Sequence, residues 1–77
     1  MNILFIGGAG FIGSSLVKQF LSNEKFKVFV IEPEFANVSR LDGLDVNIFR
    51  MALDNVDGVE HILVSNKIDV VVHLVST

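Results

Sequence analysis

A glycine-rich segment, Gly7-Gly8-Ala9-Gly10-Phe11-Ile12-Gly13, lies near the start of the chain and separates two patterns of apolar residues. Before it, residues 3–6 form a continuous apolar run, which is typical of a strand buried on both faces of a parallel sheet. After it, residues 11–22 have apolar side chains at helical spacing. The order is therefore strand, glycine turn and helix.

Three glycines in this segment have the spacing that a turn around a phosphate requires. Gly7 permits a tight turn out of the strand, Gly10 lets the backbone approach a phosphate, and Gly13 allows close packing of the helix on the sheet. The amides near Phe11 and Ile12 are donors at the start of the helix, where an anion would sit. This layout is typical of a site for the pyrophosphate of a dinucleotide, and the alternative is a glycine-rich turn without a ligand.

The rest of the chain continues the alternation of strands and helices. Strands are predicted at residues 26–31, 46–49 and 68–75, with a loop at residues 34–45 that contains one helical turn near 38–41. A second helix runs from Asp54 or Asn55, either of which can cap it, to about residue 66. This order predicts an α/β fold, with a parallel sheet of about four strands, flanking helices and right-handed crossovers.

Each helix is predicted to cover the sheet with one apolar face. The residues assigned to these inner faces are Ile12, Leu16, Val17, Phe20 and Leu21 in the first helix, and Val56, Val59, Ile62 and Leu63 in the second.

Glu32 ends the second predicted strand, about twenty residues after the glycine turn. A carboxylate at this place can accept hydrogen bonds from the ribose hydroxyls of an adenosine and would repel a 2′-phosphate, so it favours NAD over NADP. The alternative is a solvated charge at a strand end. Arg40 is the residue that could still recognise the 2′-phosphate of NADP.

Several other residues have side chains that are candidates for chemistry or binding. Asp54 is interpreted as a helix cap rather than a neighbour of adenine, and Phe35 as a residue that could lie beside the adenine. His73 is interpreted as a packed strand residue rather than a general base, and His61 has no predicted partners for a metal. Ser76 and Thr77 follow the fourth strand, at the end of the sheet where open α/β proteins bind ligands.

The composition excludes several classes of function. The 77 residues have a net charge of -3, and the six basic residues are scattered, which argues against nucleic acid as a partner. There is no cysteine, hence no disulfide or thiolate metal site, and a cytoplasmic location is expected. No apolar run is long enough for a membrane span. Half of the residues are apolar, so further chain or a partner is expected to cover part of the surface.

Two segments resemble one known family. Residues 1–17 are similar to the opening of the extended short-chain dehydrogenases/reductases, the NAD-dependent nucleotide-sugar epimerases and dehydratases, and residues 68–76 are similar to the fourth strand of that family. The resemblance implies a partial Rossmann fold, NAD as cofactor and a nucleotide sugar as substrate of the whole protein. The residues that it assigns to the cofactor are Gly7, Gly10, Phe11, Ile12 and Gly13 at the pyrophosphate, Glu32 at the adenosine ribose, and Leu74, Val75 and Ser76 near the nicotinamide-side ribose.

The chain also departs from that family. Arg50 and Met51 occupy the places where the family often has a Gly-Asp pair that reaches the adenine. The chain contains no tyrosine, so it lacks the Tyr-x-x-x-Lys pair of the family and is expected to be inactive by itself. We therefore expect residues 1–77 to be the N-terminal part of an NAD(P)-binding Rossmann domain, with the rest of that domain and the substrate domain outside it.

Two alternatives to an enzyme half remain. One is a non-catalytic dinucleotide-binding or redox-sensing module. The other is a truncated product without a cofactor. Because a long apolar edge strand pairs readily with other chains, the isolated piece is expected to self-associate as a dimer through residues 68–75.

Overall fold

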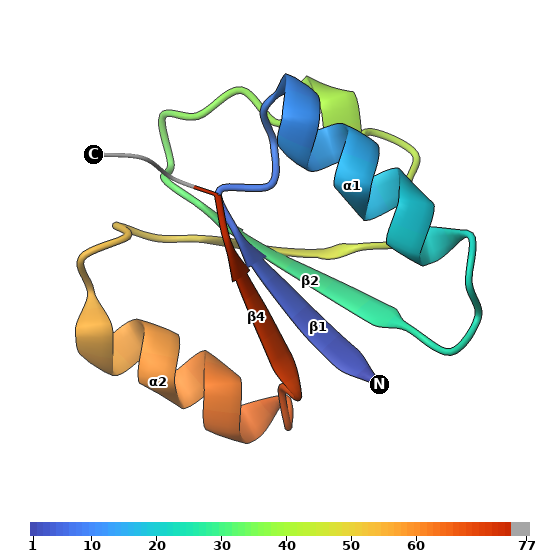
Figure 1. The fold of residues 1–77 in the computed structure, drawn as a ribbon. Coiled ribbons are helices and arrows are strands. Elements are labelled where there is room, and N and C mark those ends of the chain that lie inside the picture. The colour runs from blue at the N-terminus through green and yellow to red at the C-terminus, as the bar shows by residue number, and fades with distance from the viewer. Residues whose placement is uncertain (75–77) are drawn as a thin grey trace.

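The computed structural model describes residues 1–74 of the chain. Four parallel strands form one sheet in the order β3-β2-β1-β4, and the helices connect them (Figure 1). The predicted α/β fold, a partial Rossmann unit, is confirmed. The elements in chain order are β1 (Asn2–Ile6), α1 (Phe11–Leu21), β2 (Lys27–Glu32), the short 3-10 helix η1 (Ser39–Leu41), β3 (Asn47–Arg50), α2 (Val56–Ser65) and β4 (Val70–His73).

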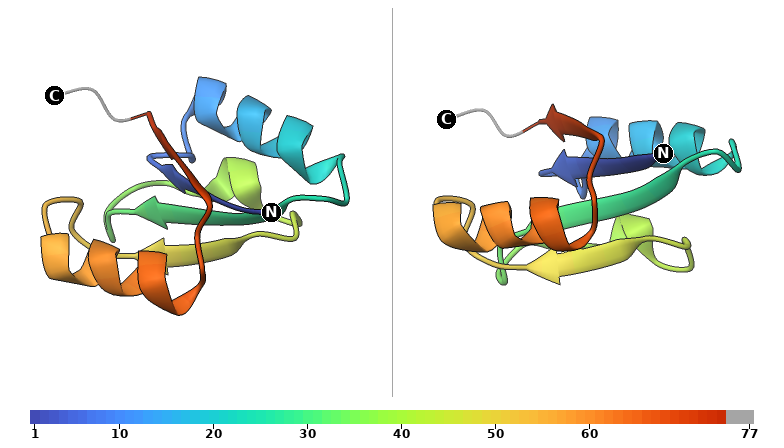
Figure 2. Two further views of the ribbon diagram at one scale, coloured as in Figure 1. Left: turned by 60° about the horizontal axis from the view of Figure 1, so that its bottom comes forward. Right: turned by 90° about the horizontal axis from the view of Figure 1, so that it is seen from below.

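The two long helices cover opposite faces of the sheet, as the views in Figures 1 and 2 show. Because side chains alternate along a strand, β1 and β2 supply residues to both faces and are buried on each. The α1 face has a core of Ile3, Phe5, Val28 and Val30 with Val17 and Leu41, and the α2 face has Leu4, Ile6, Phe29 and Ile31 with Ile62.

All four strands point the same way, so their carboxyl ends meet at one edge of the sheet (Figure 2). The glycine turn follows β1 at this edge, and Glu32 and Arg50 are register partners at the ends of β2 and β3. Strand β2 ends one residue later than predicted, so Glu32 is its last residue. Strand β4 is shorter than predicted within the described residues.

Three expectations about the helices are wrong. Ile12 and Val56, assigned to inner faces, are each 71% exposed, because both lie in the first turn of a helix, beyond the sheet that the later turns cover. Asp54 is not the cap of α2. Asn55 is the N-cap, and its Oδ1 accepts a hydrogen bond from the Gly58 N–H at 3.0 Å. Asp54 lies one residue too early, in the preceding turn, where its carbonyl accepts from the Val56 N–H.

At the amino ends of the strands, Asn2 forms hydrogen bonds between the start of β1 and the segment before β4. The Asn2 backbone N–H donates to Asp69 Oδ2 at 2.7 Å, and the Asp69 N–H donates to the Asn2 carbonyl at 2.8 Å. The Asn2 side chain also donates to the carbonyl of Asn66 at 2.8 Å. Asn2 thus holds the segment that leads into β4.

No helix within residues 1–74 is long and apolar enough to cross a membrane.

Candidate functional site

The turn after β1 has the backbone geometry that the glycines predict. Gly7 has a φ of 89°, a left-handed value that favours glycine, and its N–H donates to the Ile31 carbonyl at 3.0 Å. Gly10 is the N-cap of α1 in an extended conformation, and a Cβ built there would meet nothing within 4 Å. The surface in front of Gly10 is therefore open, as close approach of a ligand to the backbone requires.

Gly13 and Gly8 allow the helix and the turn to pack against each other. A Cβ on Gly13 would lie 2.9 Å from the Cα of Gly8, so the closest neighbour of Gly13 is the turn rather than the sheet. A Cβ on Gly8 would lie 3.1 Å from Phe5 Cβ and 3.3 Å from Val30 Cγ1. Gly8 is not among the predicted site residues. The signal in the sequence is the second glycine directly after Gly7, which indicates another position without room for a side chain.

The start of α1 lacks the usual groups that satisfy a helix terminus. Gly10 provides no side-chain cap, and the first turn contains no acidic residue. The amides at this end therefore present the positive end of the helix dipole without compensation from a side chain. An anion is the ligand that complements such a terminus.

Glu32 is buried beside the glycine turn rather than solvated at a strand end. Its side chain is 6% exposed, and its Oε1 accepts a hydrogen bond from the Ala9 N–H at 2.9 Å. The interpretation of Glu32 as a solvated charge is therefore wrong. One carboxylate oxygen holds the turn, and the group still has the capacity to accept further hydrogen bonds.

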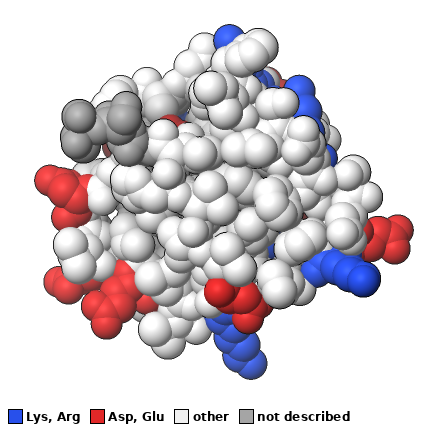
Figure 3. Space-filling view, in the orientation of Figure 1, with Lys and Arg blue, Asp and Glu red and all other residues white. Residues whose placement is uncertain are grey.

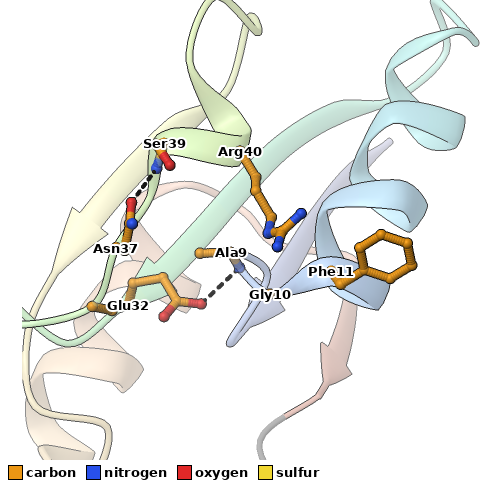
Figure 4. A pocket seen from close by; sticks show the side chains of 8 residues that line it. Ala9, Gly10, Phe11, Glu32, Asn37, Ser39 and Arg40 are labelled. Atoms are coloured by element: carbon orange, nitrogen blue, oxygen red, sulfur yellow. Dashed lines mark hydrogen bonds between the residues drawn. The ribbon is translucent and has the colours of Figure 1, made fainter.

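Glu32 and the glycine turn border a cavity of about 610 Å³ (Figure 4). On the other side, Arg40 extends from η1 toward the start of α1, and its Cζ lies 5.3 Å from the centre of the Phe11 ring. The cavity thus has one carboxylate and one guanidinium. Its lining residues are Ala9, Gly10, Phe11, Glu32, Ala36, Asn37, Ser39 and Arg40.

A second cavity adjoins the first at Gly10 and Phe11. It lies between the glycine turn and the end of β4, where the Leu74 N–H donates to the Ile6 carbonyl at 2.9 Å. Its lining residues are Gly7, Gly10, Phe11, Ile12, Gly13 and Leu74. Of the predicted cofactor residues, Val75 and Ser76 lie outside the described residues, as does Thr77.

The remaining candidates lie away from these cavities. Phe35 is 92% exposed and lines neither cavity. His73 is exposed, so its interpretation as a packed residue is wrong, because β4 forms the outer edge of the described sheet. His61 Nε2 lies 3.3 Å from Ser65 Oγ on the same helix. Within residues 1–74, no three His, Cys, Asp or Glu residues gather as a metal site would require.

Within the described residues, the face of the molecule drawn in Figure 3 has no broad basic surface. In this view acidic groups gather at the left and lower-left margin, Lys and Arg lie along the upper right, and groups of both signs lie side by side at the right and the bottom.

Comparison with known proteins identifies the family. The model of the NAD dependent epimerase/dehydratase family matches residues 3–77, and the chain belongs to that family. A search of curated proteins found no significant match.

Solved structures with the same fold agree with this assignment. The crystal structure of dTDP-glucose 4,6-dehydratase from Bacillus anthracis in complex with NAD matches with a TM-score of 0.87 and 28% identity, over 100% of this chain and 27% of that one. UDP-glucose 4-epimerase from Thermotoga maritima, solved with UDP-glucose, matches with a TM-score of 0.86 and 29% identity, over 100% of this chain and 25% of that one. WbmG from Bordetella bronchiseptica in complex with NAD matches with a TM-score of 0.86 and 25% identity, over 100% of this chain and 25% of that one. The chain therefore spans about a quarter of the length of these proteins.

Proposed function

We propose that this chain binds the adenosine and pyrophosphate half of NAD. The observation that supports this most strongly is the pair of adjoining cavities that share Gly10 and Phe11. The pyrophosphate would lie at the junction, against the open backbone of Gly10 and the uncompensated start of α1. The adenosine would extend into the Glu32 cavity, and the nicotinamide half would extend past Leu74.

The residues fit this cofactor in shape and in charge. Gly10 leaves the space that a Cβ would fill, and Gly13 cannot be larger without displacing the turn. Glu32 offers a buried carboxylate for the ribose hydroxyls and opposes a 2′-phosphate, so NAD is the preferred dinucleotide. Arg40 lines the same cavity and is the group that would favour NADP. We propose that Glu32 rather than Arg40 determines the choice between NAD and NADP. Glu32 is buried and held by the Ala9 N–H, whereas Arg40 is exposed.

For the whole protein we propose an NAD-dependent epimerase or dehydratase that acts on a nucleotide sugar. Bound NAD supplies a reversible hydride acceptor. The residues of this chain bind and orient the cofactor, and none of them acts on the sugar. The Tyr-x-x-x-Lys pair that the family uses for proton transfer would come from outside residues 1–77, which contain no tyrosine.

Titration of the natural full-length protein with NAD and with NADP tests this proposal. Isothermal calorimetry is expected to show saturable NAD binding and weaker NADP binding. Equal or tighter binding of NADP would overturn the role of Glu32, and absence of binding by either would overturn the cofactor site. If NAD binds but nucleotide sugars are not turned over, the protein is a dinucleotide-binding module rather than an enzyme.

A further inference from the structure

Arg50, at the end of β3, holds the loop that follows β2. Its Nε donates to the Pro33 carbonyl at 3.2 Å, and its Nη2 donates to the carbonyls of Glu34 and Ala36, each at 2.7 Å. One guanidinium therefore binds three carbonyl oxygens within four consecutive residues. Such charge-assisted bonds in a fixed fork are stronger than neutral ones and define geometry as well.

The same loop forms one wall of the Glu32 cavity. Ala36, whose carbonyl Arg50 binds, is itself a lining residue, and Asn37 follows it. The Ala36 N–H closes a turn by donating to the Pro33 carbonyl at 3.1 Å. Asn37 Oδ1 then accepts from the Ser39 N–H at 2.9 Å, which starts η1.

The far end of the wall is anchored by packing. Leu41, at the end of η1, is 2% exposed and belongs to the core on the α1 face. Val38 packs against the same core. Nearer to Glu32, Arg50 binds the carbonyls of residues 33, 34 and 36. The position of residues 33–36 therefore depends on Arg50.

We propose that Arg50 is a positioning residue that fixes this wall for the adenosine end of the dinucleotide, an inference that rests on the proposed NAD site. Its place in the sheet explains why it can do so. Arg50 in β3 is the register partner of Glu32 in β2. The pairing of these two strands therefore places the Arg50 guanidinium next to the loop that leaves β2 after Glu32. Without Arg50, binding itself must order the loop, and that cost lowers affinity.

Arg50→Met and Arg50→Lys in the natural full-length protein test the proposal. Arg50→Met removes all three bonds, whereas a lysine ammonium keeps the charge but cannot reproduce the planar fork. The dissociation constant for NAD is expected to rise about tenfold in Arg50→Met, with partial recovery in Arg50→Lys. Lys27→Met is the matched control, because it removes one positive charge from the other end of β2, beside Phe29.

Hydrogen exchange provides a readout without a cofactor. Exchange of the Ala36 amide is expected to accelerate in Arg50→Met, while the Lys27 amide, which donates to the Met1 carbonyl, keeps its wild-type rate. A uniform increase at both amides in both Arg50 variants would show general destabilisation and overturn the positioning role. Wild-type exchange at Ala36 with wild-type NAD affinity would also overturn it.

The two proposals fail in different ways. If the wild-type protein binds no NAD, the proposed function is wrong, and the exchange of Ala36 alone decides whether Arg50 holds the wall. If the wild type binds NAD and Arg50→Met binds it equally well, the site stands and the role of Arg50 is wrong.

Discussion

The backbone N–H of Ala9 donates to Glu32 Oε1 at 2.9 Å, so the carboxylate at the end of β2 is bound to the turn that follows β1. Both residues are buried, at 6% exposure each. Glu32 therefore has two separable properties in the proposed site. It is an acceptor that holds the glycine turn, and it is a negative charge that faces the ribose.

Glu32→Gln is expected to separate these properties. The amide oxygen of glutamine can still accept from Ala9, whereas the charge that opposes a 2′-phosphate is lost. The ratio of NADP to NAD affinity should rise about tenfold, equivalent to about 1.4 kcal/mol, in parallel calorimetric titrations. Glu32→Ala is the contrasting variant, because it leaves the buried Ala9 N–H without its acceptor and should lower the free energy of unfolding by about 1–3 kcal/mol. An unchanged ratio in Glu32→Gln would contradict the assignment.

Gly10→Ala is expected to weaken NAD binding with little effect on folding. The backbone at Gly10, with φ −72° and ψ 179°, suits alanine, and the added Cβ meets nothing within the protein. The methyl group would instead occupy the space proposed for the pyrophosphate. Thermal unfolding should show a loss below about 1 kcal/mol, and calorimetry an NAD affinity about tenfold lower. Wild-type affinity would show that the pyrophosphate lies elsewhere.

Gly13→Ala is expected to destabilise the fold. Its Cβ would approach the backbone of Gly8 to 2.9 Å, and backbone cannot move aside as a flexible side chain can. The free energy of unfolding should fall by about 1–3 kcal/mol, the usual cost of overpacking, in a denaturant titration. Gly10→Ala serves as the control for an added methyl group in the same segment, and equal stability of the two variants would refute this account.

Asn55→Ala tests the observed cap of α2. The variant removes the acceptor of the Gly58 N–H, and the expected loss is about 1 kcal/mol in the free energy of unfolding. Asp54→Ala, one residue earlier, should change stability by less than about 0.5 kcal/mol because Asp54 is exposed. A larger loss in Asp54→Ala than in Asn55→Ala would reverse this assignment.

The isolated 77-residue chain is expected to self-associate through β4. This strand pairs with β1 on one side and forms the edge of the sheet within the described residues, with Val70 and Val71 39% and 45% exposed. A lysine at an edge opposes strand pairing between chains, so Val71→Lys should shift the sedimentation coefficient toward that of a monomer. Val64→Lys on α2, also at an exposed valine, should not. A monomeric wild-type chain at high concentration would disprove the expectation.

The strands and the glycine turn could be predicted from the sequence because local patterns determine them. The buried runs at β1 and β2 and the Gly7 turn depend on residues adjacent in the chain. The exposure of Ile12 and Val56 could not be predicted, because helical spacing does not show where the sheet beneath a helix ends.

In the candidate site, too, the features that depend on neighbours in the chain could be predicted, and those that depend on strand pairing could not. Glu32 was predicted from its distance along the chain after the glycines. Its bond to Ala9, and the three bonds of Arg50, depend on the pairing of β2 with its neighbours and on the path of the loop after Glu32. The sequence shows Arg50 only as a departure from the family pattern, because its partners are backbone carbonyl oxygens, which every residue has.

The clamp between Asn2 and Asp69 has a consequence for synthesis on the ribosome. Strand β1 is made before β4, and its pairing with β4 waits until residues 70–73 have emerged. Until then one side of this apolar strand has no neighbour. The contact between Asn2 and Asp69 must join residues that are 67 positions apart in the chain. Loop closure over such a separation is slow compared with local pairing. The nascent chain therefore passes through a stage in which β1, a strand that is buried in the folded protein, is open on one edge to a chaperone or another nascent chain.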